Sequence, residues 1–291
     1  MKLSIIIVHY NTTDLTAACL RSIFKYAPVV PYEVILVDNA SAPSSIATLR
    51  SEFPETNILA NLSNLGFSKA CNVGIRSAKG EYICLLNSDT ELNEDPWSVC
   101  LEAFQNSPGI GVVTCRLTYP DGKIQHNCQR FPSLTAELIE ITRLHKLFSA
   151  SGAAELLRGS FFDHERDLDG GWVWGTFFMF RKSDLNKLEE GKLSERFFMY
   201  GEDMEWCFQF RKAGLRTKFL ASAGIIHHSG GSSAITSEEK TAGIIKNELE
   251  WLLSTKGKFY TWLFRKIRFL KYKSLRRKYP NLGELASYYR G

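Results

Sequence analysis

Short apolar runs alternate with amphipathic segments over the first 120 residues of the chain. The apolar runs are rich in β-branched residues, as in buried strands, and the segments between them repeat apolar residues at helical spacing. We expect strands at residues 3–10, 32–38, 56–60, 81–89 and 109–117, and helices at residues 13–26, 66–78 and 95–107 and after Pro43. This alternation predicts an α/β fold, with a mostly parallel sheet and helices on both of its faces.

The second half of the chain is less regular. Residues 118–127 predict a hairpin around Asp121 and Gly122, whereas residues 133–170 show no single period. The other predicted elements are an apolar strand at 170–182, a loop leading into a helix at 195–214, two short strands at 215–228 and a helix at 237–253. No internal repeat or low-complexity linker divides the chain.

The composition is that of an ordinary globular protein. Hydrophobic residues make up 44% of the 291 residues and charged residues 23%, and the formal charge is only +5. The seven cysteines form no CxxC pair and lie mostly in apolar stretches, so we expect buried, reduced thiols in a reducing compartment. Residues 3–8 are too few for a signal peptide, and no stretch approaches the roughly 18 apolar residues of a membrane span. We therefore expect a cytoplasmic protein.

Three of the predicted strands end in polar residues. They are His9-Tyr10-Asn11, Asp38-Asn39 and Asn87-Ser88-Asp89. Because ligands of parallel α/β sheets bind at the carboxyl ends of the strands, we expect these residues to converge at one edge. Asp89 could hold a divalent cation together with phosphate oxygens, although Asn-Ser-Asp is also common in turns. Asp38 could bind a base or a ribose hydroxyl, or it could cap a helix.

Three further segments carry candidate chemistry. Gly66 and the helix after it offer free N–H groups and a positive dipole end for a phosphate or sugar, but no GK[ST] or GxGxxG motif is present. The adjacent carboxylates Glu202 and Asp203 begin a helix, where the dipole stabilises them and where one could act as a general base. The pair His227-His228 is either structural or a metal ligand.

Seven segments in this order resemble the inverting glycosyltransferases of family 2, which have the GT-A fold. They are "SIIIVHYN", "VILVDNAS", "NLGFSKACNVGI", "YICLLNSDTEL", "GTFFMFRK", "RFFMYGEDMEWCFQFRKAG" and "GIIHHSGGSS". The resemblance covers roughly residues 1–235, and "NLGF", "NSDT" and "YGEDMEW" are most similar to the rhamnosyltransferase-like subgroup. Enzymes of that subgroup build O-antigen, capsule or other cell-wall polysaccharide.

The resemblance implies a role for each matching residue. Asp203 matches the catalytic base, with Glu202 as the second candidate, and Asp89 and His227 match ligands of a Mg²⁺ or Mn²⁺ cofactor. The first acidic position of the family's D-x-D motif is Asn87 here, so we expect weaker metal binding. The implied donor-binding residues are His9, Asn11, Asp38, Asn39, Asn64, Gly66, Phe67, Asn72, Asn87 and Ser88.

The implied reaction moves a sugar from a nucleotide sugar to a hydroxyl of a growing, lipid-linked cell-surface polysaccharide. The subgroup favours L-rhamnose from dTDP-L-rhamnose. A UDP-hexose donor on the same fold is one alternative, and a non-catalytic nucleotide-sugar-binding partner in a glycan synthase complex is another. We expect a GT-A domain at residues 1–235, with a nucleotide-sugar-binding half at 1–120 and an acceptor-binding half at 121–235.

Residues 236–291 are expected to form a helical tail. Between Lys256 and Lys278 it carries ten Lys or Arg and no acidic residue, interleaved with aromatic residues. This pattern favours a helix lying on an anionic membrane surface, and it predicts a peripheral protein at the inner face of the cell membrane. The alternatives are a helix packed on the domain or a nucleic-acid-binding face. No nucleic-acid-binding fold accompanies the tail, so we expect no nucleic-acid partner.

Overall fold

The computed structural model describes residues 1–229, 236–275 and 283–290, and it divides the chain into two compact units. The sheet unit comprises residues 1–129 and 163–234, and the helical unit comprises residues 130–162 and 235–291. Residues 130–162, which the sequence assigns to the acceptor-binding half, therefore group with the C-terminal segment. Arg276, Arg277 and Lys278 of the predicted tail lie outside the described residues.

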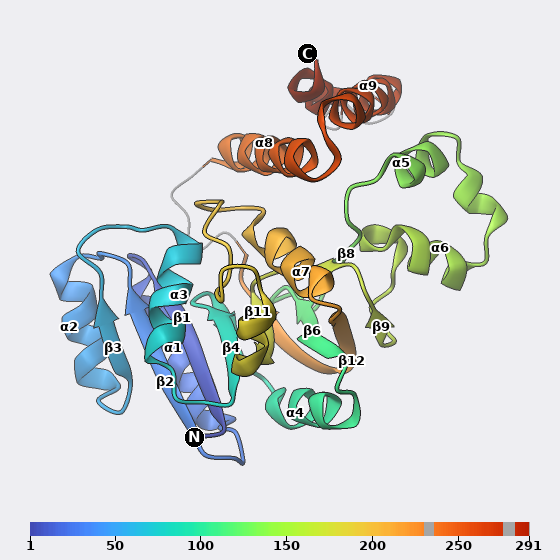
Figure 1. Cartoon of the computed structure of the whole chain (residues 1–291). Helices are drawn as coiled ribbons and strands as arrows, with labels where there is room; N and C mark the ends of the chain where they lie inside the picture. The colour runs from blue at the N-terminus through green and yellow to red at the C-terminus, as the bar shows by residue number, and fades with distance from the viewer. Residues whose placement is uncertain (230–235, 276–282, 291) are drawn as a thin grey trace. The chain divides into compact units, whose positions relative to one another are not determined.

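The sheet unit contains most of the predicted strands and helices (Figure 1). Its strands are β1 (Leu3–His9), β2 (Tyr32–Asp38), β3 (Asn57–Ala60), β4 (Tyr82–Asn87), β5 (Thr90–Glu91), β6 (Ile110–Thr118), β7 (Ile124–Gln125), β8 (Cys128–Gln129), β9 (Leu168–Asp169), β10 (Trp172–Val173), β11 (Phe177–Arg181) and β12 (Arg216–His227). Its helices are α1 (Thr13–Lys25), α2 (Pro43–Glu52), α3 (Phe67–Ser77), α4 (Trp97–Asn106), the 3-10 helix η3 (Lys182–Lys187) and α7 (Glu202–Lys212).

Within the described residues, a ten-stranded mixed sheet runs in the order β3-β2-β1-β4-β11-β6-β12-β5, with β7 beside β6 and β9 beside β12. The strands β3, β2, β1 and β4 are parallel, as are β6 and β12, whereas β11 is antiparallel to β4 and β6. The predicted mostly parallel α/β sheet is confirmed, and so is the hairpin that joins β6 to β7.

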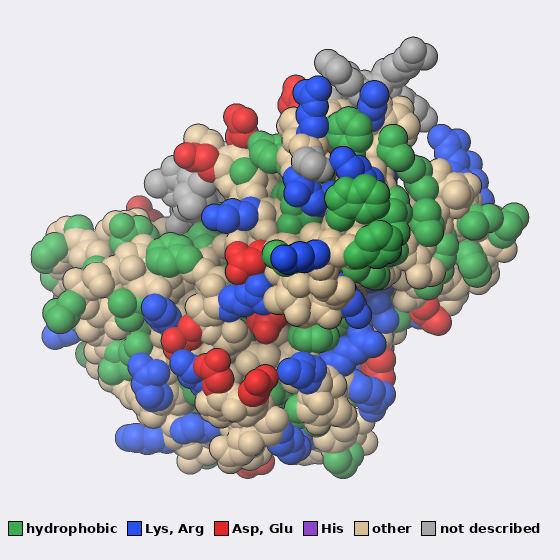
Figure 2. Space-filling view, turned by 45° about the horizontal axis from the view of Figure 1, so that its top comes forward, with side chains coloured by type: hydrophobic (Ala, Val, Ile, Leu, Met, Phe, Trp, Pro, Cys, Tyr) green, Lys and Arg blue, Asp and Glu red, His purple; other side chains and the backbone are tan. Residues whose placement is uncertain are grey.

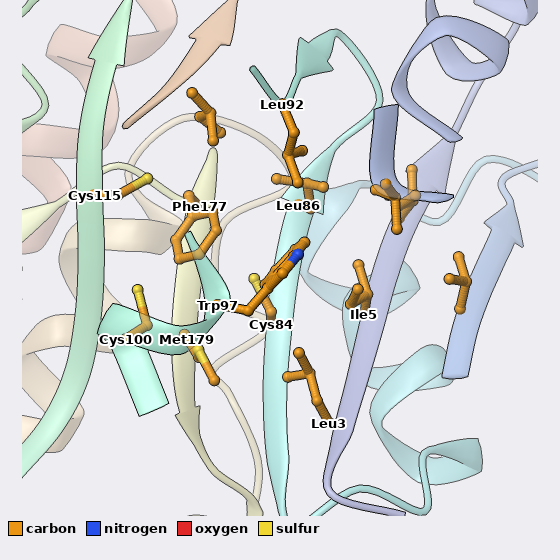
Figure 3. Close-up of a cluster of buried hydrophobic side chains, with 14 of the residues drawn as sticks. Leu3, Ile5, Cys84, Leu86, Leu92, Trp97, Cys100, Cys115, Phe177 and Met179 are labelled. Atoms are coloured by element: carbon orange, nitrogen blue, oxygen red, sulfur yellow. The ribbon is translucent and has the colours of Figure 1, made fainter. Parts of the chain in front are cut away.

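Alternate side chains of the strands bury two faces of the sheet. On one face Phe177 stacks on Trp97 of α4, with 5.7 Å between ring centroids, in a cluster that also holds Cys84 and Leu86 (Figure 3). On the other face Phe178 packs edge-on against Trp206 of α7. All seven cysteines are buried, as expected, and none of them forms a disulfide.

Two strand predictions were wrong in detail. Residues 216–227 form one strand rather than two, because β12 keeps its pairing with β6 through a register shift between Leu220 and Gly224. The apolar segment 170–182 breaks at residues 174–176 into β10 and β11. The break arises because Trp174 donates its N–H to Asn127, while Thr176 accepts a hydrogen bond from the N–H of Asn87.

The helical unit contains α5 (Leu134–Ile141), η1 (Leu144–Leu147), α6 (Ala150–Leu157), η2 (Gly159–Phe161), α8 (Ser237–Lys256), α9 (Lys258–Leu275) and η4 (Leu285–Tyr289). An ion cluster joins α5 to α9: buried Glu137 lies 2.8 Å from Arg130, 2.8 Å from Arg268 and 3.1 Å from Lys271. Arg268 also lies 3.3 Å from Glu248 of α8. In the described part of the chain, no helix is both long and apolar enough to span a membrane.

Candidate active site

The carboxyl ends of three parallel strands bring the predicted polar residues to one edge of the sheet. In the sheet register His9 pairs with Asp38, and Val8 pairs with Asn87. The expected convergence of the strand ends is therefore confirmed. It follows directly from parallel pairing, since the ends of neighbouring parallel strands must meet at the same edge.

Asn39 organises the loop that leads from β3 to α3. Its side-chain oxygen accepts hydrogen bonds from Asn61 and from the N–H of Leu65, and its amide group donates to Asn64 at 2.8 Å. Asn64 in turn accepts a hydrogen bond from the N–H of Gly66 at 2.9 Å. Buried Asn39 thus fixes the loop that presents the N-terminus of α3 at the sheet edge.

Gly66 is required by the close approach of a second loop. Its φ is +81°, and a Cβ built there would lie 2.6 Å from the ring of Phe198 and 2.7 Å from the Phe198 carbonyl oxygen. The same carbonyl accepts a hydrogen bond from the N–H of Phe67 at 3.0 Å. Asn72 holds this loop from the other side, because it donates to Leu193 at 2.8 Å. These contacts fix the segment that immediately precedes Asp203.

The polar side chains at the ends of β1 and β2 form hydrogen bonds mainly with the helices and loops next to them. The buried ring of His9 lies 2.8 Å from the Thr16 hydroxyl and 2.7 Å from the Ser45 hydroxyl, so it ties α1 and α2 to β1. Asp38 accepts a hydrogen bond from the N–H of Ser41, and Asn11 accepts one from the N–H of Ala42. Donor binding by His9, Asn11 and Asp38 stays a prediction.

Asp89 and His227 lie side by side because their strands pair. His227 of β12 pairs with Thr90 of β5, and the N–H of His228 donates to the Asp89 carbonyl oxygen at 2.9 Å. As a result, Nε2 of His227 lies 3.4 Å from Oδ1 of Asp89. Both side chains are almost fully buried.

Gln125 sets the tautomer of His227, although no sequence pattern marks Gln125 as a site residue. Its amide group donates to the His227 carbonyl oxygen at 2.7 Å, so its oxygen must face Nδ1 of the ring, also at 2.7 Å. Nδ1 therefore carries a proton, which leaves Nε2 as the ring nitrogen that can direct a lone pair toward Asp89. With that lone pair, two acceptors face each other, and a cation between them would stabilise the pair.

This pair suits a divalent cation. Two ligands about 2.1 Å from a Mg²⁺ or Mn²⁺ ion and at right angles stand about 3 Å apart, close to the separation seen here. The described residues contain no group of three or more metal-ligating side chains. Asp89 and His227 could therefore hold an ion only together with other oxygen ligands, such as water or a diphosphate. Ser88, which bonds the Thr12 hydroxyl at 3.3 Å, lies beside this pair in the sequence.

Residues 174–176 connect this strand edge to Asp203. Asn87 donates its backbone N–H to the Thr176 carbonyl oxygen at 3.0 Å. One residue earlier, Gly175 donates its N–H to Oδ2 of Asp203 at 3.3 Å. A short bridge of backbone thus fixes the carboxylate of Asp203 relative to the tip of β4. The sequence could not predict this bridge, because the segment looks like uninterrupted strand.

Two carboxyl groups share the first turn of α7, and burial perturbs both. Burial raises the pKa of Asp203 to about 6, even though the N–H groups of Met204 and Gly175 bond its carboxylate. Burial and the charge of Asp203 together raise the pKa of Glu202 to about 8. At neutral pH Asp203 is thus the ionised member and Glu202 the protonated one. Only Asp203 can then take up a proton.

A fixed, partly desolvated carboxylate, linked by backbone to the strand tip that leads to a carboxylate–imidazole pair, is suited to deprotonating a nucleophile while a leaving anion is stabilised. The backbone before α7 is constrained as well, since Tyr200 has a φ of +67° and Gly201 a φ of +106°. Such left-handed residues redirect the chain sharply into the helix and fix where its first turn points. Such an arrangement would suit proton transfer coupled to departure of an anion.

Comparison with known proteins identifies relatives of this chain. A sequence model of glycosyl transferase family 2 matches residues 4–189. An N-acetylglucosaminyl-diphospho-decaprenol L-rhamnosyltransferase of Mycobacterium tuberculosis is 25% identical over 218 residues, which are 70% of this chain and 68% of that protein. The O-antigen biosynthesis protein RfbC of Myxococcus xanthus is 25% identical over 238 residues, which are 79% of this chain.

The chain spans between 18% and 68% of the length of these two proteins and of a third curated relative. Among solved structures, the mannosyltransferase PcManGT from Pyrobaculum calidifontis, in complex with GDP-Man and Mn²⁺, superposes with a TM-score of 0.57. That similarity covers 98% of this chain and 79% of that one at 13% identity.

Proposed function

Because this chain belongs to glycosyl transferase family 2, has the GT-A fold and is a glycosyltransferase, we propose that it glycosylates a growing cell-surface polysaccharide with inversion. The sugar would come from a nucleotide sugar and pass to a hydroxyl of a lipid-linked glycan. We favour L-rhamnose from dTDP-L-rhamnose, since the mycobacterial relative is an L-rhamnosyltransferase with a decaprenol-linked substrate. A UDP-hexose donor is the alternative.

The observation that carries this proposal is the bridge from Asn87 through Thr176 and Gly175 to Asp203. Asp203 accepts the proton of the acceptor hydroxyl as that oxygen forms a bond to the anomeric carbon. The bond from the same carbon to the diphosphate oxygen breaks on the opposite side, so the configuration inverts in one step. Glu202, protonated at neutral pH, keeps the neighbouring position uncharged.

Asp89 and His227 would hold the Mg²⁺ or Mn²⁺ ion, and Gln125 would keep the imidazole in the tautomer that can ligate. When bound, such an ion neutralises the charge that develops on the leaving nucleoside diphosphate. The solved mannosyltransferase with GDP-Man and Mn²⁺ supports this assignment by its fold. Because Asn87 leaves one carboxylate at the D-x-D position, the diphosphate must supply further ligands.

We place the enzyme at the cytoplasmic face of the cell membrane, where a lipid-linked acceptor would be available. The basic composition of residues 256–278 supports a peripheral association with that surface. The structure qualifies the tail, since Arg268 and Lys271 are paired with Glu137 and do not face outward. Nucleic acid is not an expected partner.

A donor screen tests the proposal. The purified full chain is incubated with dTDP-L-rhamnose, UDP-glucose and other nucleotide sugars, with and without Mn²⁺, and released nucleoside diphosphate is measured. Release from dTDP-L-rhamnose that depends on Mn²⁺ is the expected result, and release from a UDP-hexose alone would select the alternative donor. Nucleotide binding by calorimetry without any turnover, even with a lipid-linked acceptor, would indicate a non-catalytic binding partner instead.

A further inference from the structure

The helical unit differs sharply in charge from the sheet unit. It contains seventeen Lys and Arg against eight Asp and Glu, a formal charge of +9, whereas the sheet unit has a formal charge of −4. Sixteen large hydrophobic side chains are exposed in the described part of the chain, and ten of them lie in the helical unit. The helical unit, with fewer than a third of the residues, thus has the net positive charge and most of the exposed large hydrophobic side chains.

Helix α9 has a packed side that accounts for some of its basic residues. Successive residues of a helix are about 100° apart, which places Thr261, Phe264, Arg268 and Lys271 on one side. Thr261 and Phe264 are buried there, and Arg268 and Lys271 bind Glu137. This side anchors α9 within the helical unit, and its charges are neutralised.

The opposite side of α9 is unlike the outer side of a water-exposed helix. It carries Phe259, Trp262, Leu263, Lys266, Phe269, Leu270 and Lys273. Phe259 is 76% exposed and stacks on Trp262, which is 51% exposed, and Leu270 is 56% exposed. A helix packed on one side only should be polar on the other. In Figure 2 hydrophobic and basic side chains lie interspersed over the upper part of the face shown.

We propose that this outward side of α9, from Phe259 to Lys273, is the surface that binds an anionic lipid bilayer, with the helix axis in the plane of the membrane. Aromatic and leucine side chains enter the boundary between headgroups and acyl chains, while lysines contact anionic headgroups. The choice of a bilayer over a protein partner rests on charge: α9 carries no acidic residue, and exposed aromatic side chains alternate with lysines. This inference deepens the proposed function and rests on it for the location of the acceptor.

Vesicle binding of the full chain tests the surface. Vesicles of phosphatidylcholine are compared with vesicles containing about one third phosphatidylglycerol by co-sedimentation. Phe259→Ser/Trp262→Ser should weaken binding to the anionic vesicles at least about tenfold. The matched control is Ile244→Ser/Leu253→Ser, which removes two apolar side chains of α8 that are 45% and 46% exposed. The control should bind like the wild type.

Charge is tested separately. Lys266→Glu/Lys273→Glu should weaken binding at least about 25-fold, since each lysine near an anionic surface contributes about fivefold. Lys123→Glu/Lys212→Glu, at exposed positions of the sheet unit, makes the same change of charge elsewhere and should have little effect. Added salt should weaken wild-type binding.

Three results would overturn the inference. They are absence of wild-type binding to anionic vesicles, equal loss in the α9 variants and their controls, and α9 variants that change only the oligomeric state in size-exclusion chromatography. A measurement of donor turnover distinguishes a failure of the membrane-surface inference from a failure of the proposed function. Vesicle binding without turnover of any donor would remove the proposed reaction and leave the surface, whereas turnover without vesicle binding would do the reverse.

Discussion

Replacing Asp203 by asparagine should remove most of the activity while making the protein more stable. Asparagine keeps the size of the side chain and its acceptor for the Gly175 N–H, but it cannot take up a proton. General base catalysis contributes about 10²- to 10⁴-fold, so we expect a loss in kcat/KM of that size. In the wild type kcat/KM should rise about tenfold per pH unit below pH 6 and level off above it, because Asp203 must be ionised.

The stability change follows from the same pKa. The pKa of Asp203 is raised from 3.8 to about 6, so the native state binds its proton more tightly than the unfolded chain does. The free energy of unfolding therefore decreases as the pH rises from about 4 to 6. At pH 7 the ionised carboxylate lowers it by about 1–3 kcal/mol. Asp203→Asn should regain part of that amount in urea unfolding at pH 7, since its amide keeps one of the two accepted N–H bonds, and little of it at pH 4. A substitution that increases stability and decreases activity is expected at a residue whose buried charge is needed for catalysis.

Glu202→Gln is the matched control, because glutamine resembles the protonated carboxyl that Glu202 carries below about pH 8. It should change kcat/KM at pH 7 by less than about threefold. The measurement is nucleoside diphosphate release as a function of pH for both variants. Loss of activity in Glu202→Gln with retention in Asp203→Asn would refute this reasoning and make Glu202 the base.

Three further substitutions test other parts of the structure. Gln125→Leu should weaken Mn²⁺ binding in the presence of dTDP about 10- to 100-fold by calorimetry, since it frees the tautomer of His227. Glu137→Gln should lower the free energy of unfolding in urea by about 3 kcal/mol. Burial alone would raise the pKa of Glu137, but Arg268, Lys271 and Arg130 lower it to about 2. The difference in stability between wild type and variant should therefore vanish as the pH falls from about 5 to 2. Gly66→Ala should lower the free energy of unfolding by more than 2 kcal/mol, roughly, because its Cβ would strike Phe198.

Each of these has a control in the chain. Gln129→Leu removes a nearby glutamine that does not contact His227, and Mn²⁺ binding equally weakened by it would contradict the role of Gln125. Glu284→Gln replaces an exposed glutamate that directly precedes η4 and should change stability by less than about 0.5 kcal/mol. Gly122→Ala shares the φ of Gly66, +82° against +81°, but meets no atom within 4 Å. If both alanine variants cost the same, the contact with Phe198 is not the cause.

The parts of the site that could be predicted are those set by local pattern. Parallel pairing brings Asp38 and Asn87 to one edge whatever the loops do, so the apolar runs and their polar ends were sufficient. Gln125 could not be found in this way, because it meets His227 across 102 residues of sequence. Arg268 was similarly unpredictable, since a basic run gives no sign that Glu137 neutralises it from a separate helix.

In the proposed function, Asn87 bears on both the binding of the diphosphate and the position of the base. As an amide it adds no charge beside Asp89, so the tip of β4 carries one carboxylate rather than two. A second carboxylate there would strengthen metal binding but would also repel the donor whenever the metal is absent. Asn87 also binds Thr176 through its backbone N–H, and through Thr176 it is linked to Gly175 and Asp203. In the proposed function, Asn87→Asp should therefore strengthen metal binding, while the backbone bond to Thr176 stays and the weak side-chain contact with the Thr176 hydroxyl changes.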